Sequence, residues 1–323
     1  MNMICKRRHA LALLAAAPAL AQASVGSNIS LLVPYPAGGQ ADAVARFVQN
    51  EFERVVSKTV VVENAPGGAG AIAVNRVLNT APDGRVLLVG TPLELIQAPL
   101  GLAAVKHRPE QLRMLSLMGR TALMLVVRPN LPVANVAELL ALVRKSRPEM
   151  SYCSSGRGSI FHLVSERFGI DAGIKLLQVP YRGGAQMLPA LAAGEVDMGF
   201  IPLGGPVMGM IRQGRLKALA ITTAERHKAF PDVPTMDETG LFKGFEFDAW
   251  AALVAARGIP EEAAQQLNAA MGQVIRQPKV RADIEGSGMA VAAAMGLAET
   301  ERFYASEAER YQRIAQAIGL RPE

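Results

Sequence analysis

Ser159 and His162 are spaced as a serine nucleophile and its histidine base could be, three residues apart at the predicted start of a helix. Such a serine also needs a group that orients the histidine, and the sequence does not indicate an acid in that role. The Gly-x-Ser-x-Gly turn of α/β hydrolases is absent as well. We therefore interpret Ser159 as a helix cap or ligand-binding hydroxyl and His162 as a packing residue. An α/β hydrolase that uses this pair is the alternative.

The sequence predicts neither a metal site nor a bound cofactor. It contains four widely separated histidines: His9, His107, His162 and His227. None of them belongs to a HExxH motif or to another paired metal-ligand spacing. The pattern Gly68-x-Gly70-x-x-Ala73 is similar to a dinucleotide fingerprint. However, five residues separate it from the preceding predicted strand, and the ribose-binding acid is missing. We expect no cofactor, no metal ion and no enzyme activity.

Four loops rich in glycine and serine each follow a predicted strand and precede a predicted helix: residues 35–42, 66–70, 154–159 and 181–184. Free backbone N–H groups and the positive end of the helix dipole make such positions good anion sites. In parallel α/β sheets these loops gather at the carboxyl edge of the strands, where ligands bind. We therefore predict an anion site formed by loops from two parts of the chain.

The first 23 residues have the features of an export signal. A basic start, an apolar run and an Ala-x-Ala cleavage site follow one another at residues 6–8, 10–20 and 21–23. The apolar run is shorter than the roughly 20 residues that span a bilayer.

Cleavage removes three of the 34 Lys and Arg residues and lowers the formal net charge from +6 to +3. Such a small charge gives no reason to expect nucleic-acid binding. The mature chain keeps only Cys153, which cannot form an internal disulfide.

The predicted strands and helices alternate in two series, which favours an α/β fold with parallel sheets. The first series has strands at 29–33, 59–62 and 86–89. Its helices lie at 41–56 and from the glycine-rich stretch 66–70 to residue 78. The second has strands at 150–153, 176–179, 196–201 and 216–222 and helices at 136–145, 159–168, 185–193 and 208–213. Apolar crossings near 123–128 and 247–254 lead to C-terminal helices at 261–276 and 299–318. We predict a hinged clamshell, with a signal peptide at 1–23, domain 1 at 24–125 plus 251–323, and domain 2 at 126–250.

Seven motifs occur in a fixed order along the chain. They are Tyr35-x-x-Gly38-Gly39-x-x-Asp42, Val62-Glu63-Asn64-x-Pro66-Gly67, Pro82-Asp83-Gly84, Ser154-Ser155-Gly156-x-Gly158-Ser159-x-x-His162-Leu163, Val179-Pro180-Tyr181-Arg182-Gly183-Gly184, Gly194-Glu195-Val196-Asp197 and Asp232-Val233-Pro234-Thr235. Together they resemble the Bug family of periplasmic solute receptors, the binding components of tripartite tricarboxylate transporters. The resemblance covers residues 29–320, nearly all of the mature chain.

The resemblance implies a type II periplasmic-binding-protein fold of two doubly wound α/β domains joined by two crossing strands. It also implies a periplasmic, monomeric receptor that captures a small mono-, di- or tricarboxylate, or a related metabolite, between its domains. The receptor would deliver this ligand to the membrane subunits of a tripartite transporter. A periplasmic sensor for a signalling partner is an alternative that the sequence does not separate from transport.

The predicted ligand-binding residues come from both domains: Tyr35, Gly38, Gly39, Gln40, Asp42, Thr91, Ser154, Ser155, Ser159, Tyr181, Arg182, Gly183, Gly184, Ala185 and Ile201. Asp42 is expected to support the first loop unless the ligand is cationic, since a carboxylate repels an anion. Hydroxyls of Ser155 and Ser159 are expected to converge on one carboxylate, with Arg182 either a clamp or a rim residue. Gln40-Ala41 and Ala65 depart from the family pattern, which leaves the ligand's identity open.

Overall fold

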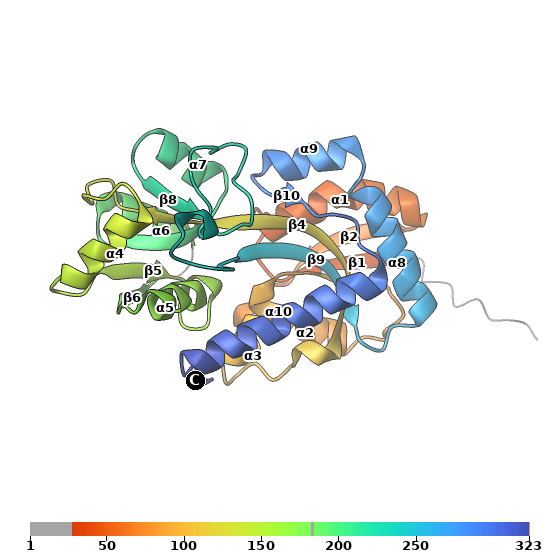
Figure 1. Cartoon of the computed structure of the whole chain (residues 1–323). Helices are drawn as coiled ribbons and strands as arrows, with labels where there is room; N and C mark the ends of the chain where they lie inside the picture. The colour runs from red at the N-terminus through yellow and green to blue at the C-terminus, as the bar shows by residue number, and fades with distance from the viewer. Residues whose placement is uncertain (1–27, 182–183, 323) are drawn as a thin grey trace, which may run out of the picture.

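The computed structural model describes residues 28–181 and 184–322, which form two α/β halves joined by two long strands (Figure 1). The predicted signal peptide lies outside the described residues, as do Arg182 and Gly183. Within the described ranges no helix is both long and apolar enough to cross a membrane. A single sheet of ten strands passes through both halves, with β2-β1-β3-β9-β4-β7-β5-β6 as its main order.

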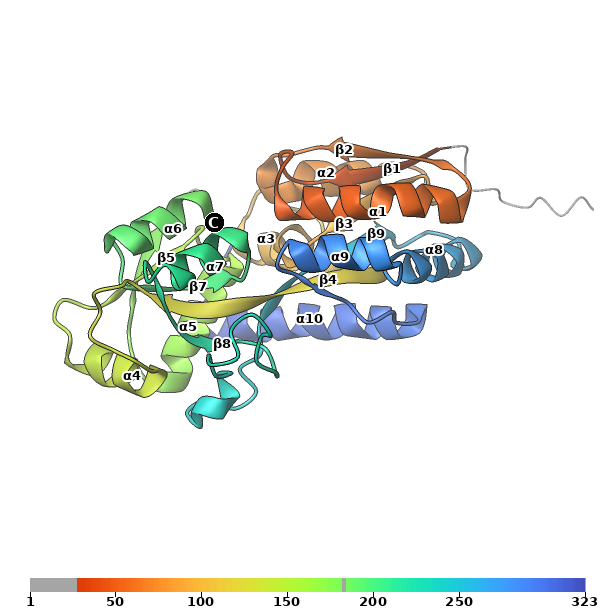
Figure 2. The same cartoon turned by 90° about the horizontal axis from the view of Figure 1, so that it is seen from above.

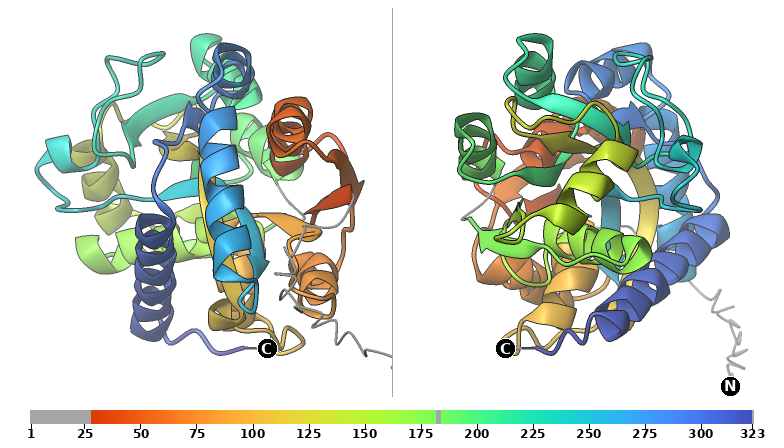
Figure 3. Two further views of the ribbon diagram at one scale, coloured as in Figure 1. Left: turned by 90° about the vertical axis from the view of Figure 1, so that its right-hand side faces the viewer. Right: turned by 60° about the vertical axis from the view of Figure 1, so that its left-hand side comes forward.

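The first half is built on three parallel strands with β1 in the middle: β1 (Asn28–Val33), β2 (Thr59–Asn64) and β3 (Val86–Gly90). Its helices are α1 (Gln40–Val56), α2 (Ala71–Leu78), α8 (Glu261–Val274), α9 (Pro278–Gly286) and α10 (Leu297–Ala317). Figures 2 and 3 show α10 on the side of this half that faces away from β1 and β2. Buried apolar residues of β1, α1 and α8 form one continuous core.

The second half has the same alternation of strands and helices. Its strands are β5 (Ser151–Ser154), β6 (Leu177–Pro180), β7 (Met198–Pro202) and β8 (Lys217–Ile221). Its helices are α4 (Val136–Lys145), α5 (Ile160–Ala172), α6 (Gly184–Ala193) and α7 (Gly205–Arg212). β5 runs parallel to β6 and β7, as predicted, whereas β8 pairs with β4 in the antiparallel sense.

Two neighbouring strands connect the halves. β4 (Leu112–Val127) and β9 (Asp248–Ala256) pair in the antiparallel sense from Leu112 opposite Ala256 to Ala122 opposite Asp248. The last five residues of β4 pair with β7 in the second half. The predicted crossing at 123–128 is thus only the end of a strand that begins at Leu112. The sheet is therefore parallel within each half and antiparallel at the crossing strands.

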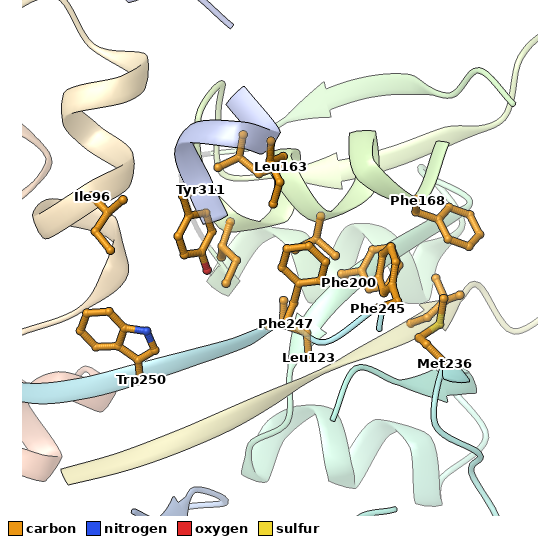
Figure 4. Packing of buried hydrophobic residues seen from close by; sticks show 14 of the residues in the cluster. Ile96, Leu123, Leu163, Phe168, Phe200, Met236, Phe245, Phe247, Trp250 and Tyr311 are labelled. Atoms are coloured by element: carbon orange, nitrogen blue, oxygen red, sulfur yellow. The ribbon is translucent and has the colours of Figure 1, made fainter. Parts of the chain in front are cut away.

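Short elements complete the chain: η1 (Gly68–Gly70), a π-turn η2 (Leu93–Gln97), α3 (Ala98–Gly101), η3 (Pro109–Gln111), η4 (Asp237–Thr239) and β10 (Ala290–Val291), which pairs with β4. A second apolar core runs through both halves. Figure 4 shows it extending from Ile96 and Trp250 past Tyr311 of α10 to Phe200 and Phe168. Because α10 packs on β4 and also contacts α5, it supports the connection between the halves.

Candidate ligand-binding site

A cavity of about 660 Å³ lies between the two halves. The first half contributes the loop after β1, the start of α1, the segment after β3, strand β9 and Met289, and the second half contributes the start of α5 and the end of β7. The lining residues are Tyr35, Pro36, Ala37, Gly38, Gly39, Gln40, Ala41, Thr91, Pro92, Leu93, Gln97, Ile160, Phe161, Pro202, Ala249, Trp250, Ala251 and Met289. Most of them are apolar, and none of these described residues is Lys or Arg. The walls therefore suit a ligand with an apolar body.

The start of α1 brings the positive end of a helix dipole to the cavity wall. The helix is preceded by Gly39, which has no side chain to accept a hydrogen bond from the N–H groups of the first turn. Gly38 has a φ of 88°, a left-handed conformation that glycine adopts without strain. Gln40 lines the cavity and donates from Nε2 to Oγ1 of Thr121 on β4, at 3.0 Å. The first loop thus offers N–H groups and a helix dipole to an anion.

Asp42 supports this loop from behind and does not line the cavity. Its carboxylate accepts from the Gly38 N–H and from Nδ2 of Asn64, both at 2.9 Å, and forms an ion pair with Arg46 at 3.0 Å. The hydrogen bond from Arg46 is the main cause that lowers the pKa of Asp42 to about 2. Asp42 is only 2% exposed, so the described contacts give no support for a direct role with a cationic ligand.

Two residues that line the cavity, Tyr35 and Thr91, contact the buried carboxyl of Glu94 through their hydroxyls. Tyr35 Oη donates to Glu94 Oε2 at 2.6 Å, and Thr91 Oγ1 donates to the same oxygen at 2.8 Å. The two hydroxyl oxygens lie 2.8 Å apart. The Thr91 N–H donates to Glu94 Oε1, and His107 Nε2 bonds to the Glu94 carbonyl oxygen at 2.7 Å. Burial raises the pKa of Glu94 to about 7, and the hydrogen bonds from Tyr35 and Thr91 act in the opposite direction.

Glu94 should make stability depend on pH. The folded protein binds this proton more tightly than the unfolded chain, so the free energy of unfolding falls as pH rises from about 5 to about 8. A shift of this size corresponds to a change of up to about 3 kcal/mol. Urea denaturation at the two pH values should show a smaller change in Glu94→Gln than in the wild type. Equal changes in both proteins would contradict the assignment.

The serines of the second half are not among the residues that line the cavity. Ser154 Oγ accepts from the Gly156 N–H at 3.2 Å and from Gln178 Nε2 at 2.8 Å. Ser159 Oγ donates to the Gly156 carbonyl at 2.8 Å and caps α5 by accepting from the backbone N–H of His162. The role of Ser154, Ser155 and Ser159 as direct ligand contacts therefore stays a prediction.

The imidazole of His162 is used within the loop. Its Nδ1 accepts from the Gly158 N–H at 3.2 Å, whereas Ser159 Oγ contacts only the backbone of His162. The two side chains therefore do not form the hydrogen bond that a nucleophile and its base require. The geometry agrees with the cap and packing roles inferred from the sequence and gives no support to the hydrolase alternative.

The other predicted residues of the second half are described only in part. Tyr181 follows β6, and its N–H donates to the Ser154 carbonyl at 2.8 Å. Ile201 is buried in the apolar core of the second half, and its neighbour Pro202 lines the cavity instead. Arg182 and Gly183 lie outside the described residues, and of Gly184 and Ala185 only their place at the start of α6 is described.

The halves touch at two glycine contacts. A Cβ built on Gly101 in α3 would lie 3.2 Å from Cα of Gly158, which precedes α5. A Cβ built on Gly288, before β10, would lie 2.9 Å from Cα of Gly204, which follows β7. A side chain at either glycine would crowd the opposite backbone, so the backbones of the two halves meet directly at these points.

Sequence reasoning missed most of the apolar wall. Trp250 and Met289 are distant in sequence from the predicted loops and reach the cavity only through the crossing strands and β10. Gln97, in η2, was missed because the segment around it shows no regular periodicity. It lines the cavity, and its amide is buried without a hydrogen-bond partner among the described residues. A buried amide without a hydrogen-bond partner indicates a possible ligand contact, but this feature can be recognised only in a structure and not in the sequence.

Comparison with known proteins agrees with this arrangement. Residues 44–320 match the model of the tripartite tricarboxylate transporter family receptor. A UPF0065 protein of Bordetella pertussis is 30% identical over 96% of this chain and 95% of its own length. The protein BugT of the same organism is 29% identical over 95% of this chain and 94% of its own length.

Solved structures show the same fold. Rpa4515 of Rhodopseudomonas palustris, with adipate, has a TM-score of 0.78 and 28% identity and covers 92% of this chain and 98% of its own. MatC of the same organism, with bound malate, has a TM-score of 0.75 and 27% identity and covers 89% and 98%. The predicted periplasmic-binding-protein fold is thus confirmed, and the family and its structural neighbours are receptors rather than enzymes. The chain belongs to the family of tripartite tricarboxylate transporter receptors.

Proposed function

We propose that this protein is exported through its leader at residues 1–23, captures a small organic carboxylate between its halves and delivers it to the membrane subunits of a tripartite transporter. The observation that carries this proposal is the position of the cavity, which is lined by the uncapped start of α1 and touches both halves. Malate and adipate are bound by two relatives, MatC and Rpa4515, which supports a carboxylate ligand here.

The same proposal includes the domain division at residues 24–125 plus 251–323 and 126–250. Both boundaries fall within β4 and β9, close to the point where β4 changes its partner from β9 to β7. A ligand that contacts both sides favours the closed form by its differential contacts. The ligand would thus control which surface the receptor presents to its membrane partner.

Native mass spectrometry of the purified protein should identify a bound carboxylate. Calorimetric titration with malate, adipate and the co-purified acid should then show binding that is lost with the corresponding methyl esters, which keep the acyl chain but replace each charge by a methyl group. Deletion of the gene should abolish uptake of that acid by cells that carry the transporter. Equal binding of acids and esters, or binding of no carboxylate at all, would contradict the proposal.

A further inference from the structure

Glu94 does not line the cavity, but it forms hydrogen bonds with two residues that do, Tyr35 and Thr91. It is fully buried in η2, and its Oε2 accepts hydrogen bonds from the hydroxyls of both Tyr35 and Thr91. An ionised carboxylate can only accept hydrogen bonds, and the two hydroxyl oxygens lie within hydrogen-bond distance of each other, so each hydroxyl proton is used by Glu94 or by the other hydroxyl. The two hydroxyl oxygens then have only lone pairs left for a ligand.

We propose that Glu94 is a specificity-determining residue that turns the Tyr35 and Thr91 hydroxyls into acceptors, so that the preferred ligand is a carboxylate bearing a hydrogen-bond donor such as a hydroxyl group. A second carboxylate at this point would face two lone pairs with a buried carboxylate behind them, and no Lys or Arg is among the described lining residues to compensate it. An alkyl group at this point would give no donor to the lone pairs that the two hydroxyl oxygens have left. This inference rests on the proposed function and specifies its ligand.

Replacement of Glu94 by glutamine should reverse the direction of these hydrogen bonds. The glutamine amide has nearly the shape of the carboxylate, but its NH₂ group would donate to the hydroxyl oxygens of Tyr35 and Thr91. Both hydroxyls could then donate into the cavity. The variant should therefore lose its preference for ligands with a donor.

The preference should also depend on pH, because protonation of Glu94 frees hydroxyl protons for the ligand in the same way. The other described titratable groups packed around η2 are His107, Tyr35, Tyr304 and Tyr311, the last of which lies against Gln97 of η2. Burial lowers the pKa of His107 and raises the pKa of each tyrosine. Glu94, whose pKa is raised to about 7, therefore changes charge between about pH 6 and pH 8, whereas burial moves the pKa of each of these neighbours away from this range.

The experiment compares acids that differ by one hydroxyl group: malate with succinate, and 3-hydroxybutyrate and 4-hydroxybutyrate with butyrate. At pH 8 the wild type should bind at least one hydroxy acid about tenfold more tightly than its counterpart, as expected for one additional buried hydrogen bond. This ratio should fall at pH 6 in the wild type. In Glu94→Gln it should be close to one at both pH values.

Two further variants keep the test decisive if Glu94→Gln does not fold. Tyr35→Phe removes one acceptor and should lower the ratio. Tyr304→Phe removes a buried hydroxyl that bonds to the Pro109 carbonyl, outside the cavity, and should leave the ratio unchanged. The inference is overturned if no hydroxy acid is preferred at pH 8, or if the preference survives in both Glu94→Gln and Tyr35→Phe. Binding of succinate or butyrate without such a preference would leave the proposed function intact, whereas failure of every carboxylate would remove both.

Discussion

Gly101→Val should weaken ligand binding by about tenfold or more while leaving the fold intact. Gly101 ends α3 with ordinary helical geometry, so a side chain there causes no backbone strain. Its Cβ, however, would lie 3.2 Å from Cα of Gly158 and 3.5 Å from the Arg157 carbonyl oxygen, both in the other half. The larger valine must therefore push the halves apart. Because a ligand that needs the closed form binds only the closed fraction, a cost of about 1.4 kcal/mol for closure lowers the affinity tenfold.

Small-angle scattering provides the second measurement for Gly101→Val. The radius of gyration of the wild type should decrease on addition of the co-purified acid, whereas that of the variant should decrease only at a concentration about tenfold higher or more. Gly209→Val is the matched control, since Gly209 is also helical but has nothing within 4 Å of the position that a Cβ would take there. A wild-type affinity in Gly101→Val, or an equal loss in Gly209→Val, would show that contact between the glycines does not limit closure.

Much of the fold followed from local patterns in the sequence. Helix α4 was predicted with its observed ends, because Asn135 caps it and the apolar positions recur with helical periodicity. The first eleven residues of β4 were not predicted as strand. They include buried Arg113, Ser116 and Thr121, and they are strand because β9 lies beside them. Such pairing between distant segments has no local signature.

Helix α9 was missed for a related reason. Only Val280 and Ile284 of its nine residues are buried, so its apolar pattern consists of one pair four residues apart.

For the site, the glycines of the first loop predicted its position well because they are needed for the turn before α1. The serines of the second half were a weaker indicator. A hydroxyl at a helix start can cap the helix or bind a ligand, and only coordinates show that Ser159 Oγ is already engaged by Gly156 and His162.

Asp42→Ala should lower the free energy of unfolding by about 2–3 kcal/mol and also weaken ligand binding. The substitution removes the buried carboxylate that is the common acceptor of the partly buried Gly38 N–H and Asn64 amide. The depressed pKa of Asp42, about 2, means that the carboxylate stabilises the folded protein above about pH 4 and loses this effect as pH falls toward 2. Binding should weaken because Gly38, held by Asp42, belongs to the cavity wall.

Asp171→Ala is the matched control, since it removes a similar Arg–Asp pair, with Arg167, from the surface of α5. We expect a loss below about 1 kcal/mol there, as for other exposed ion pairs. Urea denaturation at pH 7 and at pH 3 should show that the difference between wild type and Asp42→Ala shrinks at the lower pH. Asp42→Asn, which still offers an oxygen to the Gly38 N–H, should recover part of the stability and of the affinity. If Asp42→Ala melts and binds like the wild type, the carboxylate does not hold the first loop, and the uncapped start of α1 must keep its geometry without it.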